Sequence, residues 1–121
     1  CSDHAPVDED AKQLPFAEAE PGATGLELLL PLALKWGGDM KQPLLKTLAT
    51  ITSGPARILG INAGSLAIGE AADVCIFDPA VHVQITAESL KSQGKNTPFI
   101  GYELPGKVRC TLVSGLVVYE A

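Results

Sequence analysis

Residues 73–85 read DVCIFDPAVHVQI, and this stretch decides the fold of the second half of the chain. Between Asp73 and Asp78 lies an unbroken apolar run, which is typical of a buried strand. Pro79 is expected to break that strand, because proline has no backbone N–H to donate to a sheet. Beyond it, apolar and polar residues alternate over 81–85, which predicts a half-exposed strand. Two strands separated by the proline are therefore expected here.

A second pair of apolar segments, residues 108–113 and 116–119, flanks Ser114 and Gly115. A connection of two residues between such segments signals a β-hairpin. The second half of the chain is therefore predicted to be a small antiparallel β unit.

The first half of the chain is predicted to hold three helices, because its apolar residues recur at helical spacing. The first helix opens at Thr24, which forms a capping box with Glu27, and it ends at Gly37-Gly38. The second begins near Pro43 and the third lies within 53–60. The chain is accordingly expected to be an α+β protein.

We expect two parts along the chain. Residues 1–60 would hold an acidic loop and the helices, and residues 61–121 would form the small β domain. No internal repeat or low-complexity tract divides the chain further.

Composition excludes several classes of partner. The chain is 46% hydrophobic and 19% charged, as globular proteins are. A net charge of −5 without a basic cluster argues against nucleic acid and anionic membranes. The longest apolar stretch, residues 26–36, is about half the roughly 20 residues of a bilayer-spanning helix. Cys75 and Cys110 lie in apolar runs and are predicted to be buried thiols in a cytoplasmic protein.

An aspartate and a histidine stand side by side in the segment Ser2-Asp3-His4-Ala5-Pro6. The Asp3 carboxylate could bind a metal or take a proton, but it could also cap a turn. A metal site needs ligands from several directions, and the chain before Asp3 supplies none. We therefore expect the C-terminal piece of a larger enzyme, inactive by itself, in which His4 supports the loop around Asp3.

Three segments, in order, resemble the C-terminal end of the amidohydrolase superfamily. They are SGPARILG at 53–60, GSLAIGEAADVCIFD at 64–78 and TLVSGLVVY at 111–119. Within that superfamily the chain resembles dihydroorotases, which carry segments similar to DHAP at 3–6, PGATGLE at 21–27 and KNTPFIGY at 95–102. The last of these segments is also similar to allantoinases, so an allantoinase or hydantoinase type of substrate stays open.

The resemblance implies the end of a (β/α)8 barrel, in which Cys1-Ser2-Asp3 is the tail of the eighth strand, with a metal site at the C-terminal ends of the strands and a small β unit beside the barrel. It implies that Asp3 binds the metal and carries the proton, and that Pro21 and Gly22 contact the substrate. The implied reaction is the reversible hydrolysis of dihydroorotate to carbamoyl aspartate in pyrimidine biosynthesis. Zinc is implied for the intact protein, and none is expected in this piece alone.

Val7 departs from the dihydroorotase pattern, in which a second histidine helps to bind the substrate carboxylate. Valine neither donates a hydrogen bond nor carries charge, so about 1.5–3 kcal/mol of binding free energy would be lost. The departure resembles bacterial dihydroorotase-like chains that lack catalytic residues and serve as structural partners of aspartate transcarbamoylase. Enzyme and scaffold both stay open, and a homo-oligomer is expected because the apolar helix faces would be exposed.

Overall fold

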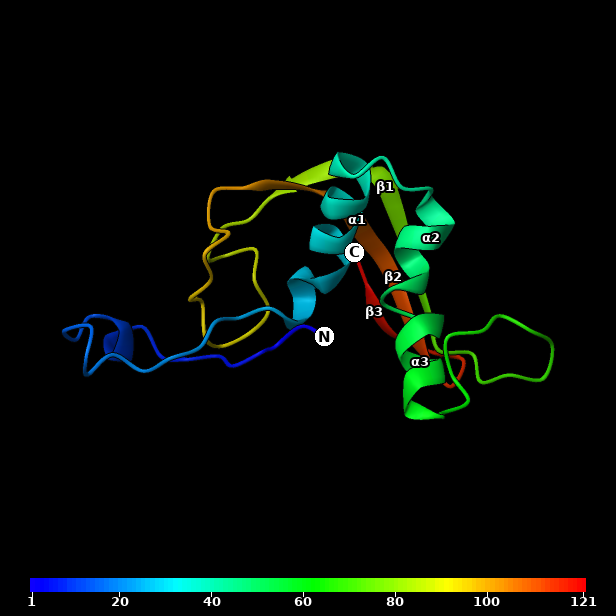
Figure 1. Cartoon of the computed structure of the whole chain (residues 1–121), viewed down its shortest axis with the longest axis horizontal. Helices are drawn as coiled ribbons and strands as arrows, with labels where there is room; N and C mark the ends of the chain where they lie inside the picture. The colour runs from blue at the N-terminus through cyan, green and yellow to red at the C-terminus, as the bar shows by residue number, and fades with distance from the viewer.

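The computed structural model describes residues 1–121 as a group of helices beside an antiparallel three-stranded sheet (Figure 1). The helices are α1 (Leu29–Asp39), α2 (Leu44–Ala49) and α3 (Ser53–Leu59), with 3-10 turns η1 (Asp10–Lys12) and η2 (Leu26–Leu28). The strands are β1 (Val74–Gln84), β2 (Glu103–Val113) and β3 (Leu116–Glu120), in the order β1-β2-β3. Helices thus precede an antiparallel sheet, as the α+β prediction states.

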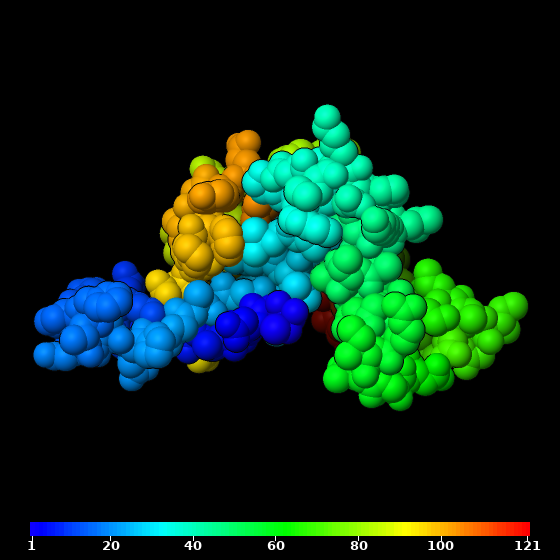
Figure 2. Space-filling model, in the orientation of Figure 1, coloured from blue at the N-terminus to red at the C-terminus, as the bar shows by residue number.

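The molecule has two projections on opposite sides of its centre. Residues 1–25 form an extended arm, blue in Figure 1, which leaves the centre and returns to it through η1. On the other side, α3 and the loop 61–72 project beyond the sheet, in green. Figure 2 shows open space beneath the centre, between these two projections. The division of the chain into units at residue 60 stays a prediction.

β1 is one continuous strand, so the expected break at Pro79 is wrong. The pairing with β2 is irregular here: Asp78 lies opposite Lys107, and the next paired residue, His82, lies opposite Pro105. Such an irregularity leaves the proline outside the regular ladder, where its missing N–H costs no pairing bond. After Pro79, half-buried and exposed residues alternate as predicted, and His82 is exposed.

The predicted hairpin is confirmed. β2 and β3 pair with Val113 opposite Leu116, and Ser114 and Gly115 form the turn with φ of 50° and 80°. Positive φ at both central residues is the geometry that matches the twist of a two-residue hairpin. The carboxylate of Asp73 accepts the Ser114 N–H at 2.7 Å and ties the turn to the start of β1.

The capping box predicted at Thr24 and Glu27 does not form. The Thr24 hydroxyl donates to the Gly94 carbonyl oxygen, and the helix begins later, through η2. The Glu27 carboxylate accepts the backbone N–H groups of Lys91 and Ser92 at 2.8 and 2.9 Å. Both side chains therefore bind a distant loop instead of the first helical turn, because tertiary partners displace the local ones.

α1 also ends later than predicted, since it runs through Gly37 and Gly38 to Asp39. Gly37 is buried where α1 crosses α2, and a Cβ added to it would lie 2.2 Å from the Thr47 hydroxyl oxygen. The glycine therefore serves the close approach of two helices and does not end the first one.

The hydrophobic core is small and lies where α1 faces the sheet and the loop after β1. Its members are Leu28, Ile85, Leu90 and Leu104, with Leu32 and Phe99 packed against them. Away from this core the sheet is open: Cys75 is exposed and Cys110 half-buried, so the prediction of buried thiols is wrong. No helix combines the length and the apolar character needed to cross a membrane.

Candidate functional site

The candidate site lies where three extended segments meet, residues 2–7, 22–26 and 94–97. The Ala5 N–H donates to the Ala23 carbonyl oxygen at 3.0 Å, which joins the first segment to the second. The Thr24 N–H donates to the Asn96 carbonyl oxygen at 2.7 Å, which joins the second to the third. The outgoing and returning parts of the arm run side by side in Figure 1. Asp3 and the glycine loop are thereby brought together, although about 20 residues separate them in the sequence.

Asp3 is exposed, and its backbone has a φ of 47°, in the left-handed region. It borders a hollow of about 420 Å³ whose wall also includes Ser2, Thr24, Gly25 and apolar residues of α1. An aspartate carboxylate at the edge of such a hollow can accept a proton or bind a cation within it.

His4 binds the start of the first helix. Its Nδ1 accepts the N–H groups of Gly25 and Leu26, each at 3.2 Å. These amide groups lack intrahelical partners, so the imidazole takes the place of a capping side chain. An acceptor at Nδ1 leaves the ring proton on Nε2 in the neutral form. The expected support of the loop by His4 thus has a definite geometry.

Gly22 packs inward, toward the first segment. Its φ is 135°, and a Cβ added to it would lie 2.5 Å from the Ala5 carbonyl oxygen and 2.9 Å from the Val7 side chain. Its own carbonyl oxygen accepts the Asn96 side-chain amide at 3.0 Å. Pro21 is exposed beside it. Contact of Pro21 and Gly22 with a substrate stays a prediction.

Val7 is buried, with 8% of its surface exposed. Val7 packs closely against two glycines. A Cβ added to Gly22 would lie 2.9 Å from the Val7 side chain, and a Cβ added to Gly94 would lie 3.0 Å from the Val7 backbone nitrogen. The valine therefore fills the space between the three segments with apolar atoms. Dihydroorotases have a histidine at this position that can contact a charged ligand. The Val7 side chain makes apolar packing contacts and cannot make that contact.

The amidohydrolase family profile matches residues 2–118 of the chain. This chain belongs to the amidohydrolase family. A dihydroorotase-like protein of Pseudomonas aeruginosa is 48% identical over 120 residues, which cover 99% of this chain and 28% of that protein. A dihydroorotase of Geobacter sp. (strain M21) is 40% identical over 121 residues, covering 100% and 28%.

The fold of this amidohydrolase chain is also found in solved structures. A D-hydantoinase from a Bacillus sp. AR9 superposes with a TM-score of 0.84 at 25% identity, covering 98% of this chain and 28% of that one. The chain thus spans about a quarter of the length of the relatives that it matches. The barrel end implied by the resemblance stays a prediction.

The residues present do not fit a zinc ion by themselves. Zinc takes three or four protein ligands, whereas no group of three His, Cys, Asp or Glu side chains in residues 1–121 could hold a metal. Asp3 offers one carboxylate, and the Nδ1 of His4 already accepts two backbone N–H groups. No catalytic step through a metal follows from this amidohydrolase chain alone.

The hydrogen bonds of Asn96, in the site, and of Glu27, next to it, could not be predicted from local pattern. Glu27 binds backbone groups 64 and 65 residues away, and Asn96 bridges to Gly22 over 74 residues. The only signal for Asn96 is its polar amide among glycine and proline in a family-like segment. The spacing of Glu27 from Thr24 fits a helix capping box, so the sequence predicted a local partner for its carboxylate instead of the distant ones that it has.

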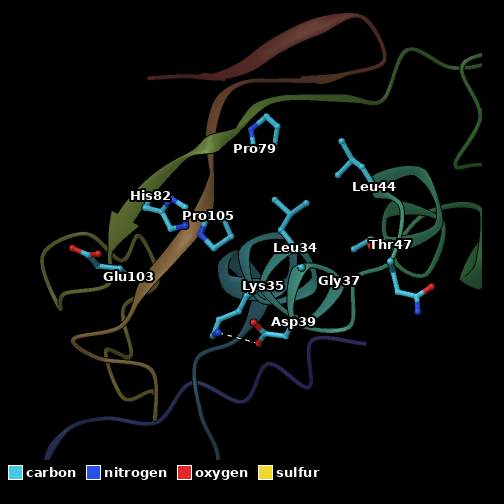
Figure 3. Close-up of a pocket in the computed structure, with 12 residues that line it drawn as sticks. Leu34, Lys35, Gly37, Asp39, Leu44, Thr47, Pro79, His82, Glu103 and Pro105 are labelled. Atoms are coloured by element: carbon cyan, nitrogen blue, oxygen red, sulfur yellow. Dashed lines mark hydrogen bonds and ion pairs between the residues drawn. The ribbon is translucent and has the colours of Figure 1, made fainter.

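A second hollow, of about 470 Å³, lies between the end of α1, the start of α2 and the two long strands (Figure 3). Lys35 forms an ion pair with Asp39 at 3.0 Å across its rim, and His82 and Glu103 come from the strands. The His82 Nδ1 lies 3.3 Å from the Ala80 carbonyl oxygen. The Lys35 cation is thus already paired with a carboxylate of its own helix.

Proposed function

We propose that this chain supplies the Asp3 segment of a cyclic amide hydrolase that converts dihydroorotate to carbamoyl aspartate. The main observation behind this proposal is that Asp3 is exposed and lines a hollow beside the glycine loop. The family match and the 40% identity to a dihydroorotase support this substrate class.

In the proposed reaction, water attacks the ring amide carbonyl carbon and the carbon–nitrogen bond breaks. Asp3 takes the proton from the water and returns it to the leaving nitrogen, as a positioned carboxylate can. Zinc in the full-length protein is part of the proposal, with Asp3 as one ligand and the others from outside these 121 residues.

The test uses the full-length protein that contains this chain and follows dihydroorotate hydrolysis with added zinc. Turnover is expected in the unmodified protein, and Asp3→Asn should lower kcat by about 10²- to 10⁴-fold, since the amide cannot take the proton. Hydantoin and allantoin are tested beside dihydroorotate, because a solved relative is a D-hydantoinase. Turnover that survives Asp3→Asn unchanged would contradict the role of Asp3.

Val7 favours a second candidate, a non-catalytic partner of aspartate transcarbamoylase. The buried valine offers no group for a substrate carboxylate, and the Pseudomonas aeruginosa relative at 48% identity is named dihydroorotase-like. On this proposal the full-length protein hydrolyses no cyclic amide, either unmodified or as Val7→His, and sediments together with aspartate transcarbamoylase. Turnover by the unmodified protein would instead leave the enzyme as the better account.

A further inference from the structure

We propose that His4 and Gly25 are positioning residues that fix the backbone of Asp3 in its left-handed conformation. The inference rests on the proposed function, in which Asp3 carries the proton. Its starting point is the φ of 47° at Asp3, in the left-handed region that is uncommon for residues other than glycine, although aspartate adopts it more often than most. Such a backbone persists only where the surrounding structure holds it, and it is common at functional sites.

The contacts that hold Asp3 come from the residues on either side of it. Before Asp3, the Ser2 carbonyl oxygen lies so close to Gly25 that an added Cβ would be 2.6 Å from it. After Asp3, the His4 ring accepts the Gly25 and Leu26 N–H groups. The Ala5 N–H is bound in turn to the Ala23 carbonyl oxygen.

His4 and Ala5 are therefore hydrogen-bonded to one short segment, residues 23–26, and Ser2 packs closely against Gly25 of the same segment. Asp3 itself is exposed between them. With His4 hydrogen-bonded and Ser2 closely packed, these contacts hold the chain on both sides of Asp3, which lines the hollow. A fixed backbone limits the positions that the Asp3 carboxylate can reach, so less conformational freedom is lost when it meets a reacting group, and positioning of this kind raises kcat.

The two contacts can be removed separately. Asparagine at position 4 places an acceptor oxygen near the position of the histidine Nδ1, whereas leucine has a similar shape and no acceptor. His4→Asn and His4→Leu thus form a matched pair that differs in the hydrogen bonds. Gly25→Ala tests the other contact, because its Cβ would displace the Ser2 carbonyl group.

The experiment measures amide hydrogen exchange and dihydroorotate kinetics in the full-length protein. In His4→Leu, peptides covering residues 2–5 and 23–26 should exchange about tenfold faster, and kcat should fall about tenfold with KM unchanged. His4→Asn should restore both within about twofold. Gly25→Ala should lower kcat without removing the His4 contact, so the proposal does not depend on one variant.

Unchanged exchange over residues 2–5 in His4→Leu would overturn the proposal. Faster exchange with an unchanged kcat in both His4→Leu and Gly25→Ala would overturn it as well, because Asp3 would then need no positioning. If the unmodified protein hydrolyses no cyclic amide, the proposed function fails by itself. The exchange difference between the leucine and asparagine variants then decides whether the contacts hold the Asp3 backbone.

Discussion

The centre of the molecule and the hairpin end of its sheet are built from similar apolar residues, yet only the centre is covered. At the centre, Leu28 and Leu104 keep 2% and 1% of their surface exposed. In β3 every residue is exposed, and Leu116 keeps 72%. Both regions form regular structure, so apolar pattern decides the secondary structure, while burial depends on what lies against it.

At the centre, α1 and the loop between β1 and β2 cover the sheet. The glycine at position 106 of β2 lets α1 approach so closely that an added Cβ would lie 2.4 Å from the Leu34 side chain. No helix of these 121 residues lies in the same way against β3, whose only strand partner is β2. The comparison therefore predicts that equal substitutions will have unequal effects in the two regions.

The largest expected difference is between two leucines. Leu104→Ala should lower the free energy of unfolding by about 2–5 kcal/mol, because it leaves a cavity in the small core. Leu116→Ala removes the same atoms from an exposed site and should change it by about 0.5 kcal/mol or less. Equilibrium urea unfolding measures both. Similar losses in the two variants would show that the hairpin end is covered after all.

A smaller difference is expected between two adjacent glycines of α1. Gly37→Ala should lower the free energy of unfolding by about 1–3 kcal/mol, because its Cβ would collide with Thr47 of α2. Gly38 has nothing within 4 Å of an added Cβ. Gly38→Ala is therefore the matched control, and it should raise the stability by up to about 1 kcal/mol through helix propensity. Thermal and urea unfolding distinguish the two, and a stabilising Gly37→Ala would refute the close helix crossing.

The sequence predicted that strands form in the second half of the chain, but it predicted less well where they begin and end and which of their side chains are buried. The hairpin followed from residues 114–115, since a two-residue turn is a local signal. β1 continues through Pro79 with an irregular pairing to β2, a strand that is distant in the sequence and that no local pattern contains. α1 continues through Gly37, whose close packing against Thr47 of the next helix is a tertiary contact that the glycine pair by itself does not reveal.

For the candidate site, family-like segments predicted roles for Asp3 and the glycine loop. The structure places the two on adjoining segments, while their roles stay predictions. The hydrogen bonds of Glu27 and Asn96 were not predictable, because they join residues more than 60 positions apart. The burial of Cys75 was predicted wrongly because the sequence of a strand does not show which other parts of the molecule pack against it.

The exposed hairpin end also predicts self-association of the isolated chain. Leu116, Val117 and Val118 are each more than half exposed, on an edge strand that can pair with another chain. At micromolar concentration the chain should sediment as more than a monomer, and Val117→Lys should shift it toward the monomer. A monomeric unmodified chain would show that these exposed residues do not drive association.

The smallest expected effect concerns the thiol of Cys75, near the open end of the sheet. Although Cys75 as a residue is exposed, partial desolvation of its thiol raises the pKa, while a hydrogen bond with Thr111 lowers it and the neighbouring Cys110 raises it. A raised pKa means less thiolate near pH 8, so alkylation by iodoacetamide should be slower in the folded chain than in urea. The two rates should converge as the pH rises and the folded-state thiol ionises. A Cys1→Ser, Cys110→Ser background isolates the signal, and equal rates at pH 8 would show that even this end of the sheet leaves the sulfur in water.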